Sequence, residues 1–197
     1  MARARKLFPI YGSALANNLL SAIDRDRVVD HFVAAYVADY DRHGILGGPA
    51  RERELAETVG REILLAMIVE VREALPIFFG KKQKSKLKSD EMEAIDAFSR
   101  ELLAALARAQ NWSAEDRRQF RRDLTLYSDF SARQEVAAKN RKKGKTPDEE
   151  APFIARVALL LDPSMLEQAR RTARKFHSGV GLLARKLLRQ TLSPGRG

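Results

Sequence analysis

Apolar residues recur every three or four positions along each long segment of this chain, and no segment alternates convincingly between apolar and polar residues. This spacing places the apolar side chains on one face of an α-helix, whereas a half-buried β-strand needs a period of two. We therefore predict an all-α fold, a bundle of six or seven helices. The expected helices begin near Ser13, Asp24, residue 50, Ser89, Ser113, Thr146 and Asp162.

We expect a single helical domain over residues 1–197, with a possible boundary between two closely packed halves at residues 80–89. The helix over residues 50–75 is expected at the centre, because its run "ILLAMIV", residues 63–69, is apolar on all sides. Pro76 disfavours helical geometry at the preceding residue, so this helix is expected to end or kink there.

Three other helix boundaries carry sequence signals. Ser113 is the expected N-cap of a helix that runs out near Ala138. The stretch "TPDE", which begins at Thr146, has the pattern of a capping box with proline at the first helical position. In the last helix, Gly179 and Gly181 interrupt the apolar pattern, and a bend or break is expected there.

The chain has no cysteine, which excludes disulfides, thiolate nucleophiles and cysteine-ligated metal centres. Its longest apolar run, "ILLAMIV", is far shorter than the roughly 20 residues that cross a bilayer, so we expect no membrane span. The basic N-terminal stretch "MARARKLFPIYGSALANN" contains Pro9 and Gly12 and is short of apolar residues for a signal peptide. A cytoplasmic location is the expectation that follows.

The formal net charge of +10 is unevenly distributed. Residues 81–88 ("KKQKSKLK") and 139–145 ("KNRKKGK") each carry +5, and residues 168–197 carry +8 without an acidic residue. The helical segments 24–80 and 89–138 are net acidic. Basic segments that converge in space bind phosphates, because neutralising a phosphate releases its counterions. The alternative is that these lysine-rich loops are only solvated.

The leading hypothesis is a non-enzymatic helical protein that binds nucleic acid through its basic segments, directed at the backbone and with little sequence selectivity. The predicted phosphate-binding residues are Lys81, Lys82, Lys84, Lys86, Lys88, Lys139, Arg141, Lys142, Lys143, Lys145, Arg170, Arg171, Arg174 and Lys175. The sequence leaves open whether the nucleic acid is DNA or RNA.

The last helix supports an alternative function, that of a protein–protein interaction or assembly subunit. Its apolar residues alternate in steps of three and four, as in a helix packed against another helix. The predicted partner-binding residues are Leu166, Phe176, Val180, Leu183 and Leu187. The partner would be an acidic protein or a second copy of the chain; an ordinary helix packed within its own fold has the same pattern.

No catalytic, metal-binding or cofactor-binding residue is predicted. "GKT" at residues 144–146 is similar to the end of a phosphate-binding loop, but Lys139 stands where that motif needs glycine. Asp39 and His43 lie one helical turn apart, but none of the three histidines follows the Glu-x-x-His pattern of di-iron bundles. The sequence therefore leans against an enzyme. A helical enzyme would instead need a buried cluster of Asp, Glu or His.

Overall fold

The computed structural model describes residues 9–25, 49–81, 86–141 and 166–193, which form five α-helices and no β-strand. The predicted all-α fold is confirmed. The predicted number of six or seven helices is not confirmed, because residues 26–48 and 142–165, over which the helices expected from Asp24 and from Thr146 would run, lie outside the described residues. Within the described helices, no stretch is both long and apolar enough to cross a membrane.

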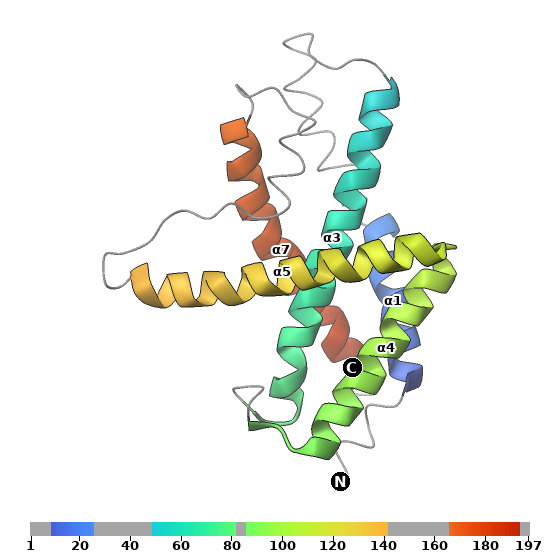
Figure 1. The fold of residues 1–197 in the computed structure, drawn as a ribbon, viewed down its shortest axis with the longest axis vertical. Helices are drawn as coiled ribbons and strands as arrows, with labels where there is room; N and C mark the ends of the chain where they lie inside the picture. Colours follow the sequence, from blue (N-terminus) through green and yellow to red (C-terminus); the bar gives the residue numbers. More distant parts are fainter. Residues whose placement is uncertain (1–8, 26–48, 82–85, 142–165, 194–197) are drawn as a thin grey trace.

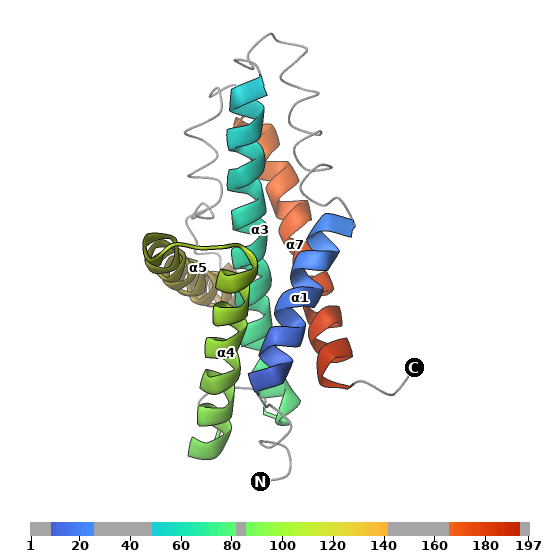
Figure 2. The same ribbon diagram turned by 90° about the vertical axis from the view of Figure 1, so that its right-hand side faces the viewer.

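The helices are α1 (Pro9–Arg25), α3 (Pro49–Phe78), α4 (Ser89–Ala109), α5 (Ala114–Arg141) and α7 (Leu166–Leu192). Figure 1 shows α3 along the long axis of the molecule, with α5 crossing in front of it. In Figure 1, α1 and α4 lie together on the same side of α3, and Figure 2 shows α7 running beside α3. The closest packing joins α1 to α4 and α7 to α3, and α5 rests on α3 where the two cross.

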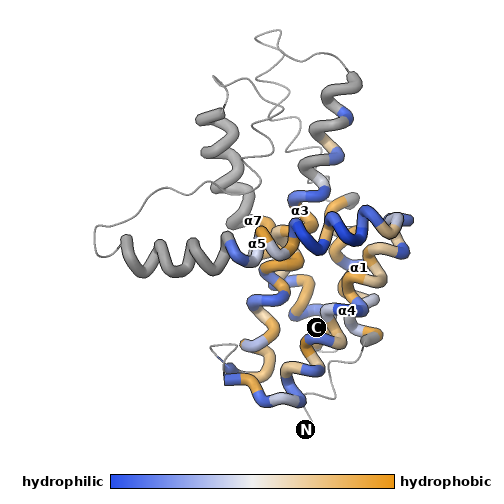
Figure 3. The backbone as a smooth tube through the Cα atoms, viewed as in Figure 1, coloured by the Kyte–Doolittle hydropathy of each residue, from blue (hydrophilic) through white to orange (hydrophobic). Residues whose placement is uncertain are grey.

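The core lies where the apolar faces of these helices meet, which Figure 3 shows as orange segments that gather in the lower half of the molecule. All seven residues of the run 63–69 are buried, so the predicted central position of α3 is confirmed. The largest fully buried side chains are Phe98, Phe120, Leu15, Leu19, Ile63, Leu65, Met67, Ile68, Leu75, Leu102 and Leu106.

The prediction that α3 ends or kinks at Leu75 is wrong about the end, because α3 continues through Pro76 to Phe78. The helix then closes with two backbone hydrogen bonds, from Lys81 N–H to the Pro76 carbonyl (3.0 Å) and from Gly80 N–H to the Ile77 carbonyl (2.8 Å). Gly80 has a φ of 74°, the left-handed conformation that this Schellman cap requires.

Of four other predicted boundaries, one is confirmed and three differ from the structure. The start of α4 at Ser89 is confirmed, but α1 begins at Pro9 and not at Ser13, whose hydroxyl donates to Glu101 on α4. Proline is favoured at a helix start, where its missing N–H costs nothing. α5 continues past Ala138 to Arg141, and α7 is one unbroken helix through Gly179 and Gly181. Tertiary packing along α3 outweighs the low helix propensity of these glycines.

Candidate nucleic-acid interface

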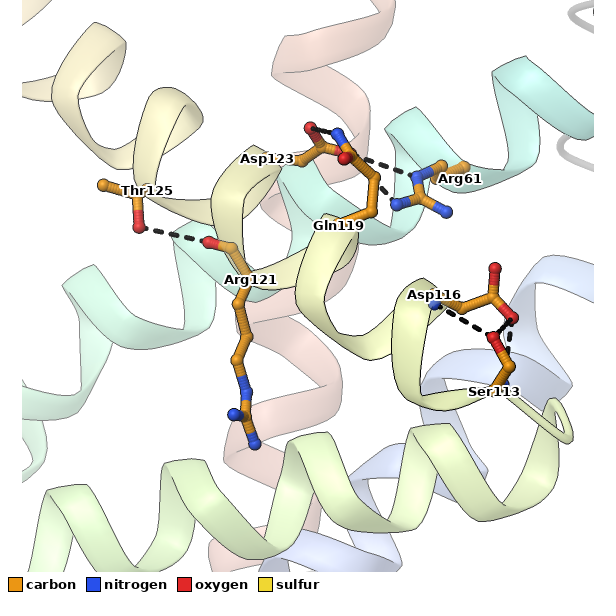
Figure 4. A network of polar contacts seen from close by, with 7 residues as sticks. All are labelled: Arg61, Ser113, Asp116, Gln119, Arg121, Asp123 and Thr125. Atoms are coloured by element: carbon orange, nitrogen blue, oxygen red, sulfur yellow. Dashed lines mark hydrogen bonds and ion pairs between the residues drawn. The ribbon is translucent and has the colours of Figure 1, made fainter.

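Helix α5 has one buried and one exposed face. Phe120, Asp123, Leu124 and Tyr127 follow the three- and four-residue spacing of a single helix face, and all four are buried. Four exposed arginines occupy the rest of the helix surface: Arg118 and Arg122 lie opposite the buried residues, and Arg117 and Arg121 lie beside them on one flank. We call these four residues the arginine face. Figure 4 shows Arg121 extending away from the side of α5 that carries Asp123.

An ion pair between a half-buried arginine and a buried aspartate anchors α5 on α3. Arg61 of α3 donates to Oδ2 of Asp123 through Nε (3.2 Å) and Nη2 (3.0 Å), while Gln119 donates to Oδ1 (2.9 Å) (Figure 4). Asp123 is only 1% exposed. The Arg61 guanidinium also lies 5.5 Å from the centre of the Phe120 ring, within range of a cation–π interaction. These contacts fix which face of α5 points to solvent.

The corner between α4 and α5 is also closely defined. Trp112 donates its backbone N–H to the Ala107 carbonyl (2.9 Å), and Asn111, with a φ of 51°, donates to the Arg108 carbonyl (3.2 Å). This is a second Schellman cap, with asparagine in the left-handed position. The Trp112 ring packs on Phe120 with ring centres 4.5 Å apart. Trp112 is therefore held at both its backbone and its side chain.

The first turn of α5 is capped by Ser113, as the sequence predicts. Asp116 N–H donates to Ser113 Oγ (3.1 Å), and both the Ser113 hydroxyl (2.7 Å) and the Ser113 N–H (2.9 Å) donate to Asp116 Oδ2 (Figure 4). The hydrogen bonds from the Ser113 hydroxyl and then from its backbone N–H lower the pKa of Asp116. The cap thus keeps an ionised carboxylate at the positive end of the helix dipole.

The arginine face is only partly neutralised. Arg118 forms an exposed ion pair with Glu115 (3.5 Å), which contributes little in water. Arg117 donates to the Ser113 carbonyl (3.3 Å). Within the described part of the chain, Arg121 and Arg122 have no ion-pair partner, so their guanidinium groups are open to a ligand.

The predicted lysine segments are only partly described. Lys81, Lys86 and Lys88 lie in the connection between α3 and α4, where Lys86 and Lys88 are exposed and Lys81 is half-buried. Lys139 and Arg141 lie in the last turn of α5, which the sequence analysis assigned to a loop, and Arg170, Arg171, Arg174 and Lys175 lie in the first half of α7. Lys82, Lys84, Lys142, Lys143 and Lys145 lie outside the described residues.

These elements do not bring the basic segments together. In Figure 1, the α3–α4 connection is at the lower end of the molecule, the last turn of α5 is at the left, and the first half of α7 is at the top. Convergence of all the predicted segments on one surface is therefore not supported by the described elements. The arginine face, which the sequence analysis missed, is a basic cluster that the described residues place within two turns of one helix.

The apolar seam of α7 is used within the chain. Val180 and Leu187 are buried and belong to the core, and Leu183 is half-buried against it. Leu166 and Phe176 lie on the same helix, and the structure describes only their backbone. Binding of a partner through this seam stays a prediction, for which Val180 and Leu187 are not accessible without opening the core.

A cleft of about 490 Å³ lies beside the α4–α5 corner. Its described lining comes from α1, α3 and the corner itself: Leu20, Ile23, Glu57, Gly60, Arg61, Leu64, Gln110 and Trp112. Trp112 and Arg61 bring an aromatic and a cationic side chain to this lining. This volume is within the range of small-molecule sites in proteins.

Two carboxylates, Glu62 and Asp123, are buried in the described part of the molecule. No group of three or more His, Asp or Glu side chains in the described ranges is arranged to hold a metal ion.

Comparison of the chain with protein-family models, with curated proteins and with solved structures found no match.

Proposed function

We propose that this protein binds nucleic acid through the arginine face of α5, chiefly at phosphates and with little sequence selectivity. The observation that carries the proposal is a cluster of four exposed arginines within two turns of a helix that is anchored to the core by its buried residues. Guanidinium groups pair with phosphate oxygens through two parallel hydrogen bonds, which gives them an advantage over lysine at such a surface.

The arrangement suits a phosphate backbone for a second reason. Arg117 and Arg121 are one helical turn apart, as are Arg118 and Arg122, so the two pairs form adjacent rows along α5. The anchored helix holds these rows in a fixed orientation at a low cost in backbone entropy. Further contacts for a longer strand are proposed at the predicted basic residues of other segments: Lys86, Lys88, Lys139, Arg141, Arg170, Arg171, Arg174 and Lys175.

The test is a salt titration of binding to a duplex and to a single strand, followed by fluorescence anisotropy. Each phosphate contact contributes about 0.9 to the slope of log K against log salt on a duplex. Arg121→Gln/Arg122→Gln should therefore lower the slope by roughly 2 and weaken binding at low salt. The matched control is Lys186→Gln/Arg189→Gln on α7, which removes the same charge from two exposed positions.

The proposal fails if the wild-type protein does not bind, or if its affinity is indifferent to salt. It also fails if the two double variants weaken binding equally, because net charge and not the arginine face would then be responsible.

The alternative is an assembly subunit that docks through α7 on a partner protein or a second copy. Because Val180 and Leu187 lie in the core, this function would depend on the first half of the helix, with Leu166 and Phe176. Light scattering separates the two functions. Self-association that Phe176→Ser abolishes, together with absent nucleic-acid binding, would favour assembly.

A further inference from the structure

The cleft at the α4–α5 corner presents an aromatic ring that is already held in place. The Trp112 ring packs on buried Phe120. The Trp112 backbone is held between the C-terminal cap of α4 and Ser113, the N-cap of α5. Trp112 is half-buried and is one of the residues that line the cleft. A planar ligand that stacks there would not need to order a flexible side chain, which lowers the cost of binding.

Arg61 supplies hydrogen-bond donors beside this ring. Its Nε and Nη2 both donate to one oxygen of Asp123, and Figure 4 shows its remaining nitrogen, Nη1, pointing away from that carboxylate. The side chain is 29% exposed and lines the cleft. Since Asp123 fixes the guanidinium plane, the direction of the N–H groups that do not bond to Asp123 is fixed as well.

Glu57 and Gln110 complete the polar lining. Glu57 is exposed and lies one helical turn before Arg61, so a carboxylate acceptor and a guanidinium donor stand side by side on α3. Gln110 can both donate and accept. The ligand that matches this set is planar, and its edge carries donors next to acceptors.

We propose that this cleft binds a single nucleobase, stacked on Trp112, with guanine preferred. Guanine presents N1–H and N2–H₂ as adjacent donors for the Glu57 carboxylate, and O6 and N7 as acceptors for Arg61. Base stacking on aromatic side chains is a common source of affinity for unpaired strands. That the base belongs to a strand held on α5 rests on the proposed function, whereas binding of a free nucleotide does not.

The only tryptophan of the chain lies in the cleft, so its fluorescence reports on binding directly. We would titrate the full chain with GMP, AMP, CMP and UMP, and with short oligothymidylates that do or do not contain one guanine. Absorption of the exciting light by the bases is corrected with free N-acetyl-tryptophanamide. We expect saturable quenching, tightest for GMP among the mononucleotides and for the guanine-containing strand among the oligomers, and no quenching by inorganic phosphate.

Glu57→Gln should weaken GMP roughly tenfold and reduce its advantage over the other nucleotides, because the new amide cannot accept from both guanine donors. Glu93→Gln, an exposed change on α4, is the matched control and should have no effect. Arg121→Gln/Arg122→Gln should weaken the oligomers while leaving GMP unchanged.

Four outcomes distinguish the nucleobase site from the proposed strand binding. Quenching by GMP without strand binding supports the cleft and removes the proposed function. Strand binding by anisotropy without quenching by any nucleotide or oligomer overturns the cleft and leaves the proposed function standing. Quenching by a fatty acid but by no nucleotide overturns the nucleobase site. Equal affinity for all four nucleotides, unaffected by Glu57→Gln, overturns the guanine preference.

Discussion

Three glycines within helices show how one hydrogen atom in place of a side chain decides local packing. A Cβ at Gly12 of α1 would lie 2.8 Å from the Phe98 carbonyl oxygen and 2.9 Å from the Leu102 nitrogen, both backbone atoms of α4. At Gly181 the nearest atom is the flexible Glu70 side chain, at 3.0 Å, and at Gly179 nothing lies within 4 Å. Close contact between α1 and α4 therefore depends on Gly12.

These surroundings predict opposite effects for the same substitution. Gly12→Ala should destabilise the fold by about 1–3 kcal/mol, because α1 and α4 must move apart. Gly179→Ala, its matched control, should stabilise by about 0.5–1 kcal/mol through helix propensity. Urea unfolding followed by circular dichroism measures both changes. Equal changes in the free energy of unfolding would contradict the close approach at Gly12.

At the scale of elements, α1 and α4 are also joined by a charged hydrogen-bond network. Glu101 of α4 accepts from the Ser13 hydroxyl (2.6 Å) and from Arg108 (2.6 Å). The Ser13 hydrogen bond first, and Arg108 second, lower the pKa of Glu101 below its ordinary value. A carboxyl group with a lowered folded pKa stabilises the fold above its unfolded pKa, and this contribution is lost as the pH falls through the folded pKa.

Ser13→Ala should therefore have an effect that depends on pH. The variant should be less stable than the wild type at neutral pH, and the difference should shrink as acidification protonates Glu101. Urea unfolding across a pH series measures this, with Ser99→Ala on α4 as the control whose effect should stay constant. A Ser13→Ala difference that does not change through the acid range would mean that the Ser13–Glu101 hydrogen bond does not stabilise the ionised carboxylate.

At the scale of the whole molecule, α7 completes the core and is not an appendage. Its buried face packs on α3 and α1, and its outer face carries Arg185, which pairs with Glu70 of α3 (2.8 Å). Thr191 accepts a hydrogen bond from Asn18 of α1 (3.0 Å). Deleting this helix would expose the core, so a deletion cannot separate assembly from folding.

Point substitutions on α7 distinguish its two faces. Leu187→Ala should cost about 2–4 kcal/mol, because Leu187 is 7% exposed within the core. Leu182→Ala should change stability by less than about 0.5 kcal/mol, because Leu182 is 68% exposed. Urea unfolding gives the two values. A small effect of Leu187→Ala would contradict the packing of α7 on α3.

The sequence predicted less of the candidate site than of the fold. The positive charge of the lysine-rich segments is uninterrupted along the sequence, whereas "DRRQFRRD" lies in a stretch whose net charge is negative. A net charge adds both faces of a helix together, and it counts Asp123 although that carboxylate is buried against Arg61. Two arginine pairs spaced by four residues were the signal that would have revealed the arginine face.

The amino-acid sequence by itself determined that the fold is helical and that residues 63–69 are central. It also determined that α4 starts at Ser89 and that Ser113 caps α5. Periodicity and capping are local properties of the chain, so the sequence alone specifies them. Only the tertiary structure decided that α3 continues through Pro76, that α7 is unbroken, and that Arg61 meets Asp123 beside Trp112. Those outcomes depend on how helices far apart in the sequence cross and pack, and the period of one helix does not specify its neighbour.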